Sequence, residues 1–138
     1  MELKLEIYKK TVESLSYLAN VDLMSLQTII DPRLIDGIEN GLIQKFEIAT
    51  EQSWKLVKKY LFENEDIDTK TPRQTIKSFY TSGYLKEIDY SLWLQALNDR
   101  NILSHRYDEQ AYQWALGRMK EYAEFYFHLI EILDKQVD

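Results

Sequence analysis

The stretch from Leu34 to Phe62, LIDGIENGLIQKFEIATEQSWKLVKKYLF, decides the fold class of this protein. Apolar or small residues recur in it every three or four positions: Leu34, Ile38, Leu42, Phe46, Ala49, Ser53, Leu56 and Tyr60. This spacing follows the period of an α-helix and predicts one long amphipathic helix. Asp31-Pro32 supplies its start, because aspartate caps a helix and proline fits the first turn. Gly37 and Gly41 leave three possibilities open, namely a break, a kink, or close approach by another helix.

The segments before and after this stretch have the same periodicity. Residues 2–20 predict a first helix with an apolar stripe of Leu5, Tyr8, Val12, Leu15 and Ala19. Residues 23–30 are apolar and either continue that helix or form a short separate one. Residues 63–70, ENEDIDTK, are polar and acidic, which predicts a loop. No alternating pattern of a β-strand is present, so the sequence predicts an all-α protein.

Three more helices are expected in the second half of the chain. Thr71-Pro72 is a helix start, and Ser82-Gly83 suits the end of that short helix, because glycine readily adopts the left-handed terminating conformation. Another helix runs from near Ser91 towards Arg100. Asp108 can cap the last one, whose stripe is Tyr112, Ala115, Met119, Tyr122, Tyr126, Leu129 and Leu133. Without repeats or linkers, residues 1–138 predict a single helical bundle domain.

Composition excludes several classes of site. The chain has no cysteine, so disulfides, thiolate metal sites and cysteine nucleophiles are impossible. The carboxylates show no ligand pattern for zinc or calcium, and neither a metal nor a cofactor is expected.

The first residues, MELKLEIYKK, lack the apolar centre of a signal peptide, and no apolar run is long enough to span a membrane. We therefore expect a cytoplasmic protein.

A net charge of −6 argues against a general nucleic-acid-binding protein, which usually has a basic surface. It leaves room for a small RNA site, provided that the cations gather in one place. Lys55, Lys58 and Lys59 lie on one face of the long helix and could steer RNA, although a solvated helix face is the simpler interpretation. Trp54, Trp93 and Trp114 are expected in the core or an interface.

The stretch from Asn98 to Asp108, NDRNILSHRYD, carries the residues best suited to chemistry. At neutral pH a histidine side chain can take a proton from a ribose 2′-hydroxyl or deliver one to a leaving oxygen. An arginine provides a permanent charge and paired donors for a phosphate. A regular helix would separate Arg100 and His105 by about 140° around its axis. They converge only if the helix ends near Ser104, or if a second subunit brings another copy.

On residue types alone, His105 could equally brace the turn between the last two helices. Tyr107 could pack the start of the last helix or hold Arg100. Asp99 and Asp108 flank the motif and could orient Arg100 or His105, but their charge opposes RNA binding. His128 lies among aromatic and apolar residues and is expected to be a packing or surface residue.

The string from Arg100 to Tyr107 resembles the R-x4-H-x-Y pattern of HEPN toxins that are encoded beside minimal nucleotidyltransferases (MNT). The longer run WLQALNDRNILSHRYDEQ is similar to the signature of the nucleotidyltransferase substrate-binding protein branch of that superfamily. So are residues 41–47, GLIQKFE, and the block from Ala49 to Lys55 that follows. Thr71-Pro72-Arg73 and Gly83 fall where that branch has its proline-arginine helix and glycine. The resemblance covers roughly residues 34–112.

This resemblance implies an all-α, up-and-down helical bundle of four to five helices that forms a homodimer, with two copies of the motif in a shared cleft. It implies metal-independent cleavage of an RNA substrate by Arg100 and His105, with Asn101 as a polar helper. The implied partner is a cognate minimal nucleotidyltransferase, the antitoxin, which transfers AMP to Tyr107. A non-catalytic substrate-binding subunit of a two-component nucleotidyltransferase is the alternative, and a helical scaffold with a structural motif is a third possibility.

Overall fold

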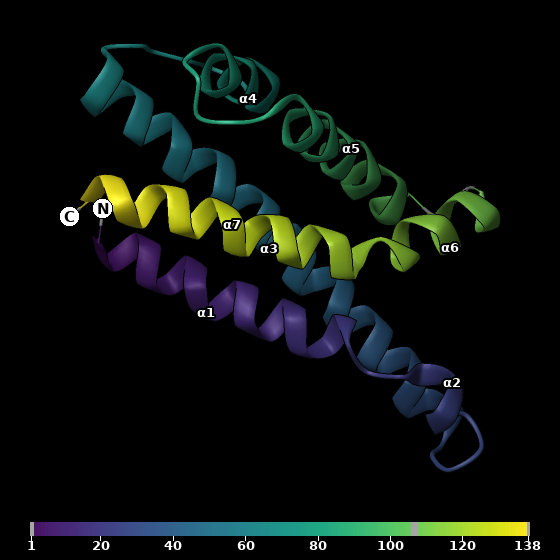
Figure 1. Cartoon of the computed structure of the whole chain (residues 1–138). Helices are drawn as coiled ribbons and strands as arrows, with labels where there is room; N and C mark the ends of the chain where they lie inside the picture. The colour runs from purple at the N-terminus through teal and green to yellow at the C-terminus, as the bar shows by residue number, and fades with distance from the viewer. Residues whose placement is uncertain (1, 106–107, 138) are drawn as a thin grey trace.

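The computed structural model describes residues 2–105 and 108–137, so Tyr107 lies outside the described residues (Figure 1). The described part is helical, as predicted. Four long helices alternate in direction: α1 (Glu2–Ala19), α3 (Pro32–Glu65), α5 (Glu87–Ser104) and α7 (Met119–Val137). Three shorter ones are α2 (Leu23–Leu26), α4 (Pro72–Thr81) and α6 (Glu109–Gly117). Seven helices within the described residues replace the predicted four to five.

The long helix α3 passes through both glycines without a break. A Cβ atom added at Gly41 would lie 3.7 Å from Leu18 Cδ1, an ordinary contact, and one at Gly37 would meet no atom within 4 Å. Neither glycine is therefore needed for a close helix approach. The predicted start is confirmed, because the Asp31 carboxylate accepts from the backbone N–H of Arg33 at 2.8 Å. The helix ends at Glu65, so the predicted loop begins three residues later than expected.

Other boundaries differ from prediction in specific ways. The apolar segment after α1 forms the separate four-residue helix α2, which Asp22 caps. Helix α5 begins at Glu87 rather than near Ser91. The predicted last helix is divided at Gly117, because glycine has low helix propensity, and the chain resumes as α7 at Met119. The end of α4 at Ser82-Gly83 is confirmed, with Gly83 at φ +91°.

Aromatic rings fill the space between the long helices. Tyr8 of α1 meets Tyr126 of α7 edge to face at 6.2 Å, and Phe46 of α3 stacks on Tyr122 at 5.3 Å. Trp93 of α5 is fully buried, as predicted for the core. These large rings remove much apolar surface from water, and aromatic pairs add a modest further stabilisation. Helix α3 contacts α1, α4, α5 and α7, so it is the central element of the bundle.

A buried ion pair joins α5 to the junction of α6 and α7. Asp99 is 1% exposed and accepts from Arg118 twice, Nε to Oδ2 at 2.7 Å and Nη2 to Oδ1 at 2.9 Å. The Tyr122 hydroxyl donates to the same carboxylate. These bonds hold the pKa of the Arg118 guanidinium above its usual range, and burial followed by the bond to Asp99 raises the pKa of the Tyr122 phenol. We call these three residues the Asp99 cluster.

The Asp99 cluster should contribute measurably to stability. Replacing Arg118 with Gln leaves the buried carboxylate with one strong donor instead of three bonds. We expect the free energy of unfolding to fall by about 2–3 kcal/mol, less than for a fully buried pair because Arg118 is partly exposed. Urea denaturation followed by circular dichroism measures this change. The matched control is Arg73→Gln, at an exposed arginine of α4, and equal effects of the two substitutions would contradict the prediction.

Candidate functional site

The candidate site lies at the C-terminal end of α5. Trp93, Ala96, Leu97 and Leu103 turn one face of α5 into the core. Arg100 lies beside this face, its side chain 27% exposed, and its Nη1 donates to Glu51 Oε2 of α3 at 2.9 Å. The guanidinium is therefore directed at the middle of α3 and already has a partner within the chain.

Glu51 is the residue of this region that sequence reasoning missed. Its partial burial raises its pKa, but the neighbouring Trp54 indole, the Lys55 ammonium and the charge of Arg100 outweigh this effect, so the pKa lies below its usual range. The carboxylate is thus an anion at neutral pH, shared by Arg100 and by Lys55 Nζ at 3.3 Å. A phosphate bound by Arg100 would have to compete with it. Partly exposed ion pairs contribute roughly 0–1 kcal/mol, so such an exchange is energetically accessible.

His105 terminates α5. Its backbone leaves the helix at φ −129°, ψ 89°, while its N–H still donates to the carbonyl oxygens of Asn101 and Ile102 at 3.2 and 3.3 Å. The residue is exposed. The helix thus ends at Ser104, which meets the condition for Arg100 and His105 to approach one site. The two residues share one helix end, with the guanidinium facing α3 and the histidine at the exposed cap.

Of the other two predicted site residues, Asn101 lies on the surface and Tyr107 lies outside the described residues. Asn101 is exposed on α5, one residue from Arg100, and its carbonyl oxygen receives the terminal bond from His105. Ser104 Oγ donates back to the carbonyl oxygen of Arg100 at 2.9 Å. Tyr107, the expected AMP acceptor, lies outside the described residues, so its relation to Arg100 stays a prediction.

The two flanking aspartates have structural partners. Asp99 points into the core, where it binds Arg118 and Tyr122. It therefore supports the motif through the helix backbone and does not orient Arg100 directly. Asp108 caps α6, as predicted, by accepting from the backbone N–H groups of Gln110 and Ala111 at 3.0 and 3.2 Å.

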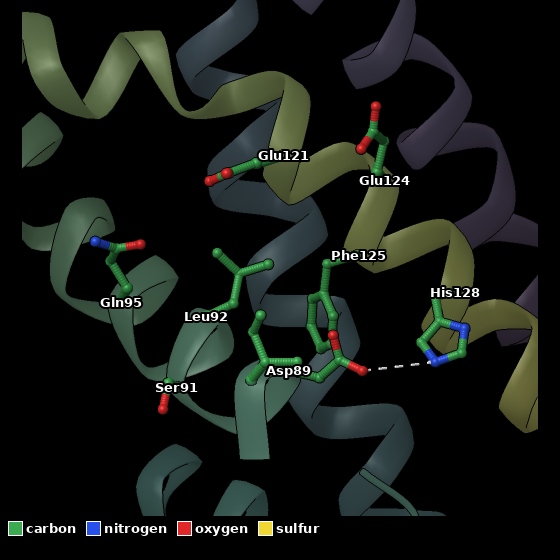
Figure 2. A pocket seen from close by; sticks show the side chains of 9 residues that line it. Asp89, Ser91, Leu92, Gln95, Glu121, Glu124, Phe125 and His128 are labelled. Carbon is green, nitrogen blue, oxygen red and sulfur yellow. Dashed lines mark ion pairs between the residues drawn. The ribbon is translucent and has the colours of Figure 1, made fainter. Parts of the chain in front are cut away.

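A groove of about 580 Å³ lies on another side of α5, between α5 and α7 (Figure 2). Its rim carries the carboxylates of Asp89, Glu121 and Glu124, while Leu92 and Phe125 form apolar walls. His128, which belongs to this groove, lies with Nε2 3.7 Å from Asp89 Oδ2 and is a surface residue. Acidic side chains repel phosphate, so this groove does not extend the candidate RNA site.

Within residues 2–105 and 108–137, no group of three or more histidine and acidic side chains is arranged to hold a metal ion. In the same residues, no helix combines the length and hydropathy needed to cross a bilayer.

Solved structures share this fold. A protein from Thermus thermophilus is 25% identical, with a TM-score of 0.77 over 91% of this chain and 98% of its own. The tri-AMPylated HEPN toxin of Shewanella oneidensis, solved in complex with MNT antitoxin, is 11% identical, with a TM-score of 0.76 over 96% of this chain and 94% of its own. HI0074 from Haemophilus influenzae, described as having the fold of a substrate-binding domain of a nucleotidyltransferase, is 21% identical. Its TM-score is 0.72 over 94% of this chain and 98% of its own.

No curated protein matches this chain. The model of one protein family does match, over residues 3–135, which is almost the whole chain. The chain belongs to the family described as nucleotidyltransferase substrate binding protein like.

Proposed function

We propose that this protein is the ribonuclease toxin of a HEPN/MNT toxin–antitoxin pair. The observation that carries the proposal is the end of α5, where Arg100 lies on the last turns and the exposed His105 is the capping residue. A permanent cation and a histidine that can exchange protons are the groups that phosphodiester cleavage without a metal requires. The family supports the class of protein, and the motif supports the reaction.

The proposed reaction is an internal transfer. A ribose 2′-hydroxyl attacks the adjacent phosphorus, the bond from phosphorus to the 5′-oxygen breaks, and a 2′,3′-cyclic phosphate forms. One group removes the 2′-hydroxyl proton and another supplies a proton to the leaving 5′-oxygen. His105 can perform either transfer, and Arg100 stabilises the negative charge that develops on the phosphate. Since each chain supplies one such histidine, we propose a homodimer in which two copies of the motif share a cleft, with Asn101 as a polar contact.

The proposed control is AMP transfer by the cognate nucleotidyltransferase. The Tyr107 hydroxyl attacks the α-phosphorus of ATP, loses its proton and releases pyrophosphate. The new phosphodiester places a negative charge next to Arg100, where RNA phosphate would otherwise bind. The HEPN toxin of Shewanella oneidensis is AMPylated and bound to its MNT antitoxin, which supports this form of control by analogy.

The bond between Arg100 and Glu51 favours a second candidate function, a non-catalytic substrate-binding subunit. In that case Arg100 would be a structural residue of the bundle, and HI0074, with the fold of a substrate-binding domain, would be the better analogue. Such a subunit would bind its nucleotidyltransferase without cutting RNA, and its complex would survive loss of Arg100 and His105.

Loss of the two motif side chains should abolish activity without unfolding the protein. We expect Arg100→Ala and His105→Ala each to lower RNA cleavage at least ~100-fold, the lower range for removing a general acid–base group or a charge stabiliser. Cleavage of a labelled RNA in the presence of a chelator measures this loss. His128→Ala and Arg73→Ala are the matched controls and should cleave at the wild-type rate. Full activity of the His105→Ala protein would remove histidine from the mechanism.

Tyr107 should be the site of modification. After incubation with the cognate nucleotidyltransferase and ATP, we expect the intact mass of the chain to rise by at least one AMP group, while RNA cleavage falls. Tyr107→Phe should remove that first addition, because phenylalanine has no hydroxyl nucleophile. Tyr17→Phe, at an exposed tyrosine of α1, should be modified like the wild type. An unchanged mass gain in the Tyr107→Phe protein would place the acceptor elsewhere.

Glu51 should weaken RNA binding by competing for Arg100. In Glu51→Gln the guanidinium loses its anionic partner and becomes fully available to phosphate. We expect the KM for RNA to fall several-fold with kcat little changed, measured from initial cleavage rates. Glu47→Gln makes the same change of charge one turn away on α3 and controls for general electrostatics. A KM that is unchanged, or that falls equally in both variants, would contradict direct competition at Arg100.

A further inference from the structure

A second groove, of about 290 Å³, lies between α1 and α3 and is lined by cations. Its walls are Lys4 and Ile7 of α1 and Gln52, Lys55, Leu56 and Lys59 of α3. Three lysines surround an aliphatic floor, and no carboxylate lines the groove. We call it the basic groove. It contains two of the three lysines that the sequence placed on one face of the long helix.

The lysines of the basic groove are weakly engaged. Lys55 and Lys59 reach Glu51 and Glu63 of their own helix at 3.3 and 3.9 Å, and the four side chains are 39–62% exposed. Such pairs contribute little, and their ammonium groups can exchange partners. Lys4 makes no ion pair within the described part of the chain. The groove can therefore offer up to three positive charges to an anion.

Gln52 is the polar, uncharged residue that lines the groove. Its side-chain oxygen is itself buried and accepts no hydrogen bond among the described residues, so this atom is not open to a ligand in this conformation. Ile7 is 48% exposed and offers an apolar surface beside it. A ligand that combines anionic groups with an apolar part fits these features, and a nucleotide unit has both.

The basic groove and the candidate site are linked through Glu51. This carboxylate pairs with Arg100 through Oε2 and with Lys55, a lysine of the groove, through Oε1. From Glu51 to Lys59 the distance along α3 is about 12 Å, at about 1.5 Å per residue. Cations of α5, α3 and α1 thus lie in one region of the molecule, with the Glu51 carboxylate between Arg100 and Lys55.

The other grooves described in the structure differ in charge. The groove of Figure 2 has a rim of carboxylates. A third groove, beside α1, mixes Lys10 and Lys45 with Glu13. In a chain of net charge −6, this groove gathers three lysines in its lining, two of which pair with the carboxylates of Glu51 and Glu63 beside it. Clefts lined by charges of one sign attract and orient ligands of the opposite sign.

We propose that the basic groove is a subsite for the phosphodiester backbone of single-stranded RNA, next to the phosphate that is cleaved at Arg100. The proposal rests on the proposed function, since it takes the strand held at Arg100 as its ligand. Lys4 and Lys59 neutralise backbone phosphates, and the aliphatic floor contacts a ribose or base. Charged grooves with apolar surfaces are a common means of holding single strands without reading their sequence.

The test compares two double variants with the same loss of charge. Lys4→Gln/Lys59→Gln changes the basic groove and leaves Lys55, Glu51 and Arg100 intact. Lys10→Gln/Lys45→Gln changes the mixed groove and is the control. The probe is a fluorescent 12-nucleotide RNA with 2′-O-methyl groups, which cannot undergo attack by its own 2′-hydroxyl. Fluorescence anisotropy over a series of salt concentrations gives the affinity, and circular dichroism verifies that both variants are folded.

For single strands, each neutralised phosphate contributes about 0.7 to the slope of log affinity against log salt. Loss of two contacts should therefore reduce this slope by about 1.4 in the basic-groove variant and leave it nearly unchanged in the control. With unmodified RNA of the same sequence, the basic-groove variant should have a raised KM and an unchanged kcat. Equal changes in both double variants would overturn the subsite, because they would reflect net charge alone.

Failure of the subsite can be separated from failure of the proposed function. If the wild type cleaves RNA and the basic-groove variant has the same slope and KM, the subsite is wrong and the ribonuclease stands. If the wild type cleaves no RNA but binds the 12-mer in a way that depends on Lys4 and Lys59, the ribonuclease is wrong and the binding site stands. If AMP competes as strongly as the 12-mer, and depends on the same lysines, the groove holds a mononucleotide and the strand proposal is overturned.

Discussion

The three bonds that converge on the Asp99 carboxylate fix the part of the molecule on which the candidate site depends. They join α5 to the junction of α6 and α7, so α5 cannot shift at Asp99 without breaking a buried, charge-assisted contact. Arg100 is the next residue, and His105 ends the same helix. A buried carboxylate is unfavourable unless it is fully hydrogen-bonded. The bonds that satisfy Asp99 therefore also fix the helix backbone next to Arg100.

Arg100 shows how one side chain can serve both the fold and the proposed chemistry. Its bond to Glu51 connects α5 with α3, the central helix, and its partial exposure leaves it within reach of a ligand. An arginine that already has a partly exposed carboxylate partner is preoriented, because its long side chain has lost conformational freedom before a phosphate arrives. The cost is competition between Glu51 and that phosphate, which a solvated pair can tolerate.

The charges of this acidic protein are sorted between its surfaces. Carboxylates gather in the groove between α5 and α7, whereas lysines line the groove between α1 and α3. The net charge therefore describes the whole surface poorly, since the potential near a groove depends mainly on the charges within about one Debye length. Arg100 of α5 and Lys55 of this groove share the Glu51 carboxylate, so the proposed strand site and the candidate site adjoin.

Local sequence determined the helices and the composition of the motif. The apolar stripes, the caps at Asp31, Thr71 and Asp108 and the terminating Gly83 depend on neighbours within a few positions, so they could be predicted. Tertiary structure decided which charges meet. Glu51 lies 49 residues from Arg100 and Asp99 lies 19 from Arg118, and no helical period relates them. The division of the last helix at Gly117 was also missed, because its apolar stripe continues across the break and only the low helix propensity of glycine marks it.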